Sequence, residues 1–204
     1  KLGYTGRGEG IAAYCVALSH GLNKETIKLG LESVTSLAGK MELIKEGQNF
    51  IAMVDYSFEP KALEKLYETI KAIPYRRLIH ILGSTGGGRD KSRRPILGRL
   101  AAERAQIVII TNEDPYDEEP AQIINQVAAG AEMAGKIKDK NLFKILDRRE
   151  AIKKALELAQ EDDLVLLTGK GAEQYICLAR GQKMPWDDRE ELRRAIVDKM
   201  CIDK

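Results

Sequence analysis

Cysteine and histidine are scarce in this sequence, which excludes several kinds of site. Among 204 residues there are three cysteines and two histidines. Cys15, Cys177 and Cys201 are scattered and form no C-x-x-C pair, a pattern typical of the reducing cytosol rather than of a disulfide scaffold. His20 and His80 are too isolated for a histidine metal site or a Ser-His-Asp triad. We therefore expect a cytoplasmic protein in which both histidines are structural and no residue binds a metal.

An excess of charge and a long apolar run are also missing. Lys and Arg number 33 against 31 Asp and Glu, so no basic surface is expected that would bind nucleic acid or anionic lipid. The longest apolar runs, such as residues 107–110, are far shorter than the roughly 18 residues of a spanning helix. No charged-then-apolar leader opens the chain. We expect neither a nucleic-acid partner nor a membrane.

The first third of the chain predicts two helices and a hairpin. Residues 1–10 contain four glycines without periodicity, and we predict a loop there. The Ala-rich run 11–20 predicts a helix, and Asn23 is expected to cap a second helix at 24–33. Two such helices are too little to enclose a core. Short apolar strands at 41–44 and 50–54 then predict a β-hairpin that opens a new domain.

From there strands and helices alternate. Strands are predicted at 78–82, 107–110, 143–146 and 164–167. Helices are predicted at 60–73, 95–103, 121–134 and 149–158, with a last one after Asp187. This order predicts an α/β, Rossmann-like fold with a mostly parallel sheet and helices on both faces, preceded by the short hairpin and the helical segment.

Three unusual loops follow the predicted strands: the glycine loop (residues 83–91), the acidic loop (111–120) and the lysine turn (169–173). Ligands of such sheets bind outside the carboxyl ends of the strands, so we expect the three loops to converge on one site. The glycine loop gives a ligand room to approach, and basic residues accompany it: Arg89, Lys91, Arg93 and Arg94. It contains no G-x-x-x-x-G-K-S/T and no G-x-G-x-x-G. It therefore suggests a carboxylate ligand, the alternative being a flexible, solvated loop.

Each of the other two loops allows a structural alternative. Acids just before Pro120 are favoured by the dipole of the helix that begins there, which explains Glu118 and Glu119. Asp114 lies too far from that helix and could instead bind a substrate ammonium. In the lysine turn, Gly169-Lys170-Gly171 is alone a weak signal and also fits a strand-to-helix turn with a solvated lysine. Residues 186–190 read as a helix start capped by Asp187 or Asp188.

Taken in order, these segments resemble the Mur ligase family, and within it the bacterial UDP-N-acetylmuramyl tripeptide synthetases. The similarity covers roughly residues 11–200. Its motifs are Gly39-Lys40-Met41-Glu42 (G-R-M-E in the family), Val54-Asp55-Tyr56 with residues 60–64 (V-D-Y-A-H-T-P-x-A-L-E), residues 86–95 (R-D-K-x-K-R-P), Glu113-Asp114-Pro115 (D-N-P or D-D-P), residues 169–173 (G-K-G-H-E) and residues 187–190 (D-D-R-E).

The resemblance implies a three-domain enzyme. Its central domain holds ATP and magnesium and activates a carboxylate as an acyl phosphate, and its last domain delivers an amine. Residues 1–36 would be the tail of the central ATPase domain, and 37–204 the amino-acid-binding domain. The partners implied are a diamino acid and a UDP-MurNAc-dipeptide. Because no Walker loop is present, the chain alone is expected to be inactive.

The resemblance also implies site residues, though no catalytic one. Arg89 would bind the carboxylate of the incoming amino acid. Asp114, Gly169 and Glu173 would hold its amine-bearing end.

Two further residues, Lys40 and Asp55, would contact nucleotide phosphate and ribose. The chain departs from the family on this side: the arginine of G-R-M-E is Lys40, two motif histidines are Phe58 and Ala172, and an Asn-rich segment is replaced by residues 6–10. Losing an arginine fork weakens bidentate phosphate contact.

The acidic loop predicts which amino acid enters. Family members that add diaminopimelate usually carry D-N-P-R, whose Asn and Arg meet the distal carboxylate, whereas this chain has Asp114 and Tyr116. We expect lysine or another simple diamino acid, unless Arg93 or Arg94 replaces the missing arginine. Two rival interpretations are a stand-alone nucleotide-binding or regulatory module without ligase activity and a degenerate ligase-like domain retained for assembly.

Overall fold

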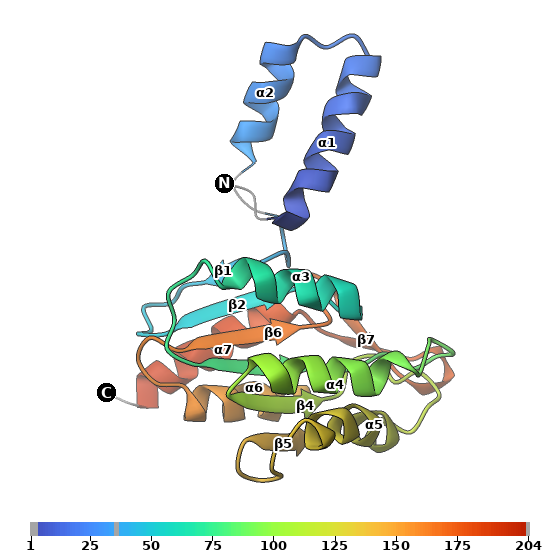
Figure 1. Ribbon diagram of the computed structural model, residues 1–204, viewed down its shortest axis with the longest axis vertical. Coiled ribbons are helices and arrows are strands. Elements are labelled where there is room, and N and C mark those ends of the chain that lie inside the picture. The colour runs from blue at the N-terminus through green and yellow to red at the C-terminus, as the bar shows by residue number, and fades with distance from the viewer. Residues whose placement is uncertain (1–3, 35–36, 203–204) are drawn as a thin grey trace.

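The computed structural model describes residues 4–34 and 37–202. It consists of a pair of helices that projects from an α/β domain (Figure 1). The pair is formed by α1 (Tyr4–Ser19) and α2 (Lys24–Ser33). Asn23 caps α2 as predicted, since its side chain accepts a hydrogen bond of 2.8 Å from the Thr26 amide.

The predicted loop at residues 1–10 is wrong over residues 4–10, where α1 has already begun. Glycine weakens a helix by about 1 kcal/mol relative to alanine but does not forbid one. Residues 1–3 lie outside the described part of the chain.

The α/β domain contains a six-stranded sheet in the order β1-β2-β6-β3-β4-β5. Its strands are β1 (Glu42–Ile44), β2 (Ile51–Asp55), β3 (Leu78–Leu82), β4 (Ile107–Thr111), β5 (Leu142–Ile145) and β6 (Leu164–Thr168). The pair β1 and β2 is the predicted antiparallel hairpin. All other neighbours are parallel, which confirms the prediction that four strands from residue 78 onward lie parallel in one sheet.

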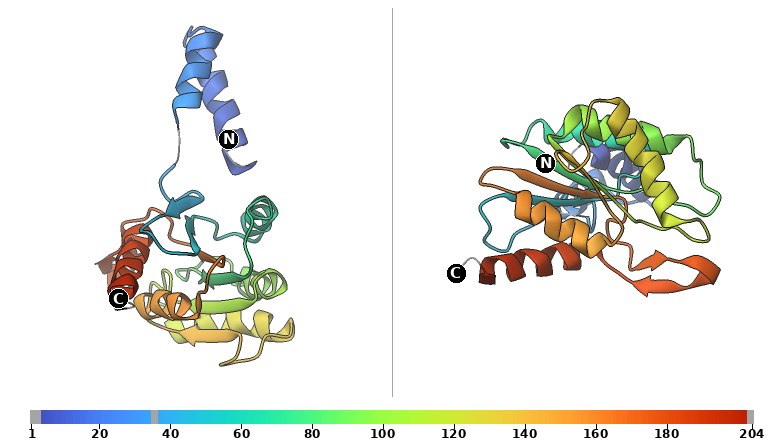
Figure 2. Two further views of the ribbon diagram at one scale, coloured as in Figure 1. Left: turned by 90° about the vertical axis from the view of Figure 1, so that its left-hand side faces the viewer. Right: turned by 90° about the horizontal axis from the view of Figure 1, so that it is seen from below.

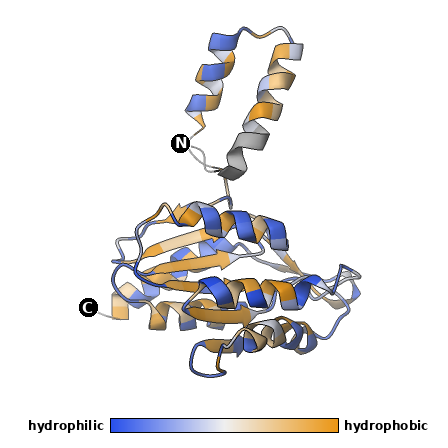
Figure 3. Cartoon of the chain, viewed as in Figure 1, coloured by the Kyte–Doolittle hydropathy of each residue, from blue (hydrophilic) through white to orange (hydrophobic). Residues whose placement is uncertain are grey.

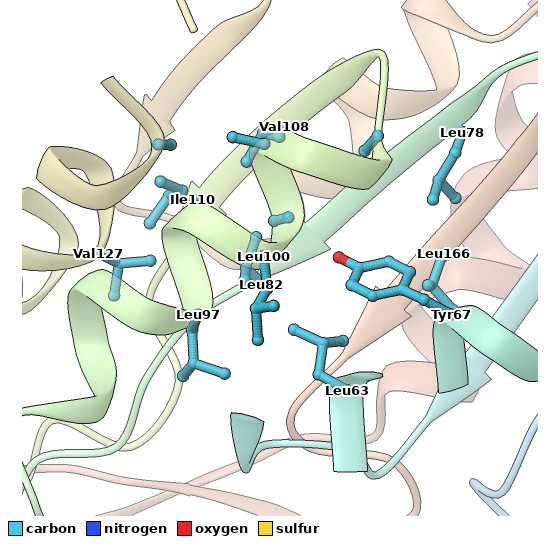
Figure 4. Packing of buried hydrophobic residues seen from close by; sticks show 14 of the residues in the cluster. Leu63, Tyr67, Leu78, Leu82, Leu97, Leu100, Val108, Ile110, Val127 and Leu166 are labelled. Carbon is cyan, nitrogen blue, oxygen red and sulfur yellow. The ribbon is translucent and has the colours of Figure 1, made fainter. Parts of the chain in front are cut away.

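Helices cover both faces of the sheet (Figure 2). On one face α3 (Pro60–Ile70), α4 (Arg93–Arg104) and α5 (Pro120–Met133) pack on one apolar cluster. On the other, α6 (Arg148–Leu158) and α7 (Asp188–Ile202) pack on a second cluster. Figure 4 shows the first cluster, in which Leu63 and Leu97 face strand residues such as Leu82. Because both faces are covered, all five residues of β3 and all five of β6 are buried.

A small second sheet was not predicted. It is a hairpin of β7 (Tyr175–Cys177) and β8 (Lys183–Pro185), joined through a short 3-10 helix at Ala179–Gly181. Strands of three residues are too short to show an alternating pattern. The hairpin extends from the domain directly after the lysine turn (Figure 2).

Hydropathy follows this layering (Figure 3): the strands are apolar, and the outward faces of the helices are polar. Within residues 4–34 and 37–202, none of the helices combines the length and the apolar character needed to cross a membrane.

Candidate functional site

The three loops that the sequence singled out follow the carboxyl ends of β3, β4 and β6, which are parallel and therefore share one edge of the sheet. The glycine loop packs directly on the acidic loop. The Gly86 amide donates to the Asp114 carbonyl at 2.7 Å, and a Cβ on Gly86 would overlap the Pro115 carbonyl oxygen. Gly87, with a φ of 64°, lies against the ring of Tyr116. These glycines allow a contact that a side chain would prevent.

Lys170 joins the acidic loop to the lysine turn. Its Nζ lies 2.8 Å from both carboxylate oxygens of Asp114 and 2.8 Å from Oε2 of Glu173. The side chain is 1% exposed, so the interpretation as a solvated lysine is wrong. Burial alone would lower the pKa of Lys170, but the hydrogen bonds to the two carboxylates raise it above its ordinary value. Lys170 is therefore held in its charged form within an acidic cluster.

Asp114 and Glu173 differ in how open they are. Asp114 is 7% exposed and also accepts a 2.7 Å hydrogen bond from the Cys177 amide. The charge that the sequence suggested for a substrate ammonium is thus already countered by Lys170. Glu173 has a side chain that is 41% exposed and accepts a hydrogen bond of 3.0 Å from the Tyr56 hydroxyl. Glu173 is the carboxylate of this cluster that a ligand can reach.

Glu113 is a third carboxylate in the cluster, and sequence reasoning did not single it out. It is 3% exposed and accepts a 2.7 Å hydrogen bond from the Thr85 hydroxyl. A Cβ on Gly169 would overlap its carboxylate, which explains a glycine at that position. Burial raises the pKa of Glu113, against the opposing effects of the Thr85 hydrogen bond and the Arg148 charge. Its position two residues after the end of β4 was the available signal.

Arg89 lies exposed on the glycine loop, free to meet an anion. Near it is Tyr116, whose pKa is raised by a hydrogen bond with Cys177, by burial and by the Asp114 charge, while Arg89 acts in the opposite direction. Arg89, Asp114 and Glu173 therefore all lie on the same edge of the sheet.

The next two arginines of the glycine-loop region are structural. Arg93 is 5% exposed and pairs with Glu59. Arg94 is fully buried and bonds both carboxylate oxygens of Glu118, at 3.1 and 3.2 Å. The expectation that either might replace the missing substrate arginine is wrong, because partners within the fold occupy both.

The nucleotide-side residues differ in availability. Lys40 is exposed, with its Nζ 5.1 Å from the centre of the Tyr56 ring, so its ammonium fits a role in meeting phosphate. Asp55 is 2% exposed, and its carboxylate accepts hydrogen bonds from the Met41 amide and from the amide and hydroxyl of Ser57. Its contact with a ribose stays a prediction that requires this segment to rearrange.

Metal ligands are not clustered in the described residues. Between residues 4–34 and 37–202 no three His, Cys, Asp or Glu side chains are arranged to hold a metal ion.

Comparison with known proteins identifies the family of the chain. A model of the family described as "Mur ligase, glutamate ligase domain" matches residues 39–171. The chain is 39% identical over 188 residues to a protein named UDP-N-acetylmuramyl-tripeptide synthetase from Roseiflexus sp. (strain RS-1), which covers 92% of this chain and 36% of that protein. It is 36% identical over 191 residues to a UDP-N-acetylmuramoyl-L-alanyl-D-glutamate--2,6-diaminopimelate ligase from Geobacillus kaustophilus. That match covers 93% of this chain and 37% of the relative. The chain thus spans little more than a third of these curated relatives.

Solved structures show the same fold. The structure of a UDP-N-acetylmuramoyl-L-alanyl-D-glutamate--2,6-diaminopimelate ligase matches with a TM-score of 0.72 at 32% identity, covering 98% of this chain and 40% of that one. A UDP-N-acetylmuramate-alanine ligase from Thermotoga maritima, at 14% identity, has a TM-score of 0.65 and shows the fold alone. The resemblance read from the motifs is confirmed, and it is favoured over a stand-alone nucleotide-binding or regulatory module.

Proposed function

The chain belongs to the Mur ligase family, and we propose on that premise that it is the amino-acid-binding part of a cytoplasmic, ATP-dependent ligase. The full protein would add a diamino acid to a UDP-MurNAc-dipeptide in peptidoglycan synthesis. The observation that carries the proposal is the shared edge of the sheet, where the exposed Arg89 and the acidic cluster around Lys170 occur together.

An amino acid matches this arrangement of charges. The Arg89 guanidinium suits the substrate carboxylate, and Glu173 offers an open carboxylate to its amine-bearing end. Gly169, with a φ of 112°, lets the backbone of the lysine turn approach the Glu113 carboxylate closely. Holding an amine in line with an activated carboxyl is worth about 7–11 kcal/mol of the barrier. We propose that this chain contributes that positioning.

The helical pair supports the proposed domain boundary. Ile11, Val16 and Leu29 are 66%, 58% and 68% exposed, and Figure 3 shows apolar positions along helices that stand away from the α/β domain. We propose that residues 1–36 are the end of the ATPase domain, whose remainder covers these side chains in the full protein. ATP and magnesium would be held mainly there, with Lys40 contributing to the phosphate.

The balance of charges favours a substrate with an ammonium at its far end. Three carboxylates, those of Asp114, Glu173 and Glu113, share this cluster with two cations, Lys170 and Arg148, and Arg148 is already paired with Asp188. Tyr116 stands where diaminopimelate-adding enzymes carry an arginine. We propose lysine or another simple diamino acid over diaminopimelate.

Competition tests this proposal. The full-length protein is given UDP-MurNAc-dipeptide, ATP, magnesium and equal amounts of L-lysine and meso-diaminopimelate, and the two products are separated by mass. The wild type should incorporate lysine roughly tenfold or more in preference, since a hydrogen bond to a charged group contributes about 1.5–3 kcal/mol. Asp114→Asn with Tyr116→Arg should reduce that preference. A wild type that prefers diaminopimelate removes the specificity proposal, and the absence of both products removes the ligase proposal.

A further inference from the structure

Arg148, the first residue of α6, is a buried arginine at the edge of the sheet where the site loops begin. It is 3% exposed and forms a two-pronged ion pair with Asp188, the first residue of α7. Its Nε lies 2.8 Å from Oδ1 and its Nη2 lies 2.7 Å from Oδ2. The Trp186 indole also donates to Asp188 Oδ1, at 2.7 Å. The guanidinium is therefore fixed in one orientation from the helix side.

The remaining donors of Arg148 reach two different loops. Nη1 donates to the carbonyl of Asn112 at 3.1 Å, and Nη2 donates to the carbonyl of Thr168 at 2.8 Å. Asn112 directly precedes Glu113 and Asp114 in the acidic loop. Thr168 directly precedes the lysine turn. One guanidinium thus binds the backbone near the start of the acidic loop and just before the lysine turn.

The sheet order leaves the two loops without a direct connection through the sheet. β6 and β4 are not neighbours, because β3 lies between them, so the ladder hydrogen bonds do not join the ends of these two strands directly. Arg148 spans that gap beyond the end of β3. On the sheet side, Thr168 is held by its hydroxyl, which lies 2.9 Å from Nε2 of the buried His80.

A planar fork is needed for these contacts. Arg148 uses it to meet one carboxylate and two carbonyls at once, whereas a lysine at this position would keep the charge but not the geometry. A buried ion pair by itself contributes little to stability relative to apolar packing. The pair lies where the acidic loop and the lysine turn begin, and this placement points to a role in the site.

We propose that Arg148, oriented by Asp188 and Trp186, is a positioning residue that sets the distance between the acidic loop and the lysine turn and thereby the affinity for the incoming amino acid. The inference rests on the proposed function. It assigns to Arg148 no contact with the substrate.

The test is steady-state kinetics of the full-length protein with L-lysine and, separately, meso-diaminopimelate as the varied substrate. Arg148→Lys should raise the KM for the amino acid about tenfold, because a small displacement of binding groups has large kinetic effects, while the KM for ATP stays unchanged. Arg77→Lys is the matched control. Arg77 pairs with the buried Asp163, with Nη2 to Oδ2 at 2.5 Å, and donates to the Leu158 carbonyl at 3.0 Å, but it lies at the opposite edge of the sheet and should leave the amino-acid KM unchanged.

A purely structural role predicts another pattern. Loss of folded protein lowers kcat in proportion and leaves KM as it was, so equal amino-acid KM values for Arg148→Lys, Arg77→Lys and wild type overturn the inference. If Arg148→Lys yields no folded protein, Trp186→Phe removes the indole hydrogen bond to Asp188 while keeping an aromatic ring in the core. It should still raise the amino-acid KM about twofold, and an unchanged KM there overturns the inference equally. A wild type without amino-acid-dependent turnover instead refutes the proposed function on which the inference rests.

Discussion

Replacing Lys170 by methionine removes the cation at the centre of the acidic cluster while keeping the length of the side chain. The ammonium is 1% exposed and is bound by Asp114 at 2.8 Å and by Glu173 at 2.8 Å. Removing one member of a buried pair costs about 3–5 kcal/mol, mostly because the remaining charge stays buried without a partner. Asp114 keeps the Cys177 amide and Glu173 is partly open to water, so we expect about 3 kcal/mol, the lower end of that range.

Thermal unfolding measures this loss. For a chain of this size about 3 kcal/mol corresponds to a fall of roughly 6–12 °C in Tm. The matched control is Lys153→Met, which removes an ion pair of the same 2.8 Å length to Glu150 between side chains that are 56% and 58% exposed. Water screens an exposed pair, which contributes little to stability, so that variant should unfold within a few degrees of the wild type and clearly above Lys170→Met.

A double variant and the pH dependence of stability test the role of the Lys170 charge further. Asp114→Asn added to Lys170→Met removes the unpaired charge and should recover part of the lost stability, as a double-mutant cycle would show. The pKa of Lys170 is raised above its ordinary value of 10.5, so its contribution is fully present below that pH and is lost only as the pH rises through the higher folded value. Equal effects of Lys170→Met and Lys153→Met, or a further loss on adding Asp114→Asn, would refute this account.

The remaining predictions concern packing and acid stability. Gly98→Ala should lower Tm by several degrees because its Cβ would overlap the carbonyl oxygen of Val127 where α4 crosses α5. Gly30→Ala has open space around it and should raise the free energy of unfolding by up to about 1 kcal/mol. Glu118→Gln should destabilise by about 1.5 kcal/mol at pH 7. Its hydrogen bonds to Arg94 and Lys91 lower the pKa of Glu118 to about 2, so the stability it contributes is present above about pH 4.5 and is lost toward pH 2, where denaturation curves of variant and wild type should coincide.

The fold was predictable because local signals agreed with the global arrangement. Apolar runs such as residues 78–82 and 164–168 are buried on both faces, and Pro60 and Pro120 stand at the starts of the helices that follow their loops. What failed was the short hairpin at 175–185 and the start of α1. The strands of the hairpin are too short to show an alternating pattern, and three glycines within residues 4–10 lower the helix propensity of that segment.

The site was predictable in its location but not in its pairing. Parallel strands bring loops together at their carboxyl ends, which is enough to place Arg89, Asp114 and Glu173 on one edge. Sequence alone could not show that Lys170 folds back onto Asp114, since 56 residues separate them. Nor could it show that Arg94 forms a buried ion pair with Glu118. Charges close in space but distant along the chain are assigned partners only by the fold.

The mass of the product tests the central claim most directly. The full-length protein is incubated with UDP-MurNAc-dipeptide, ATP, magnesium and L-lysine, and the nucleotide-linked product is weighed by mass spectrometry alongside the ADP released. We predict a UDP-MurNAc-tripeptide heavier by one lysine residue, formed together with an equal amount of ADP, and a strong reduction of both by Arg89→Ala. ADP release that does not depend on the amino acid, with the dipeptide recovered unchanged, would contradict the account.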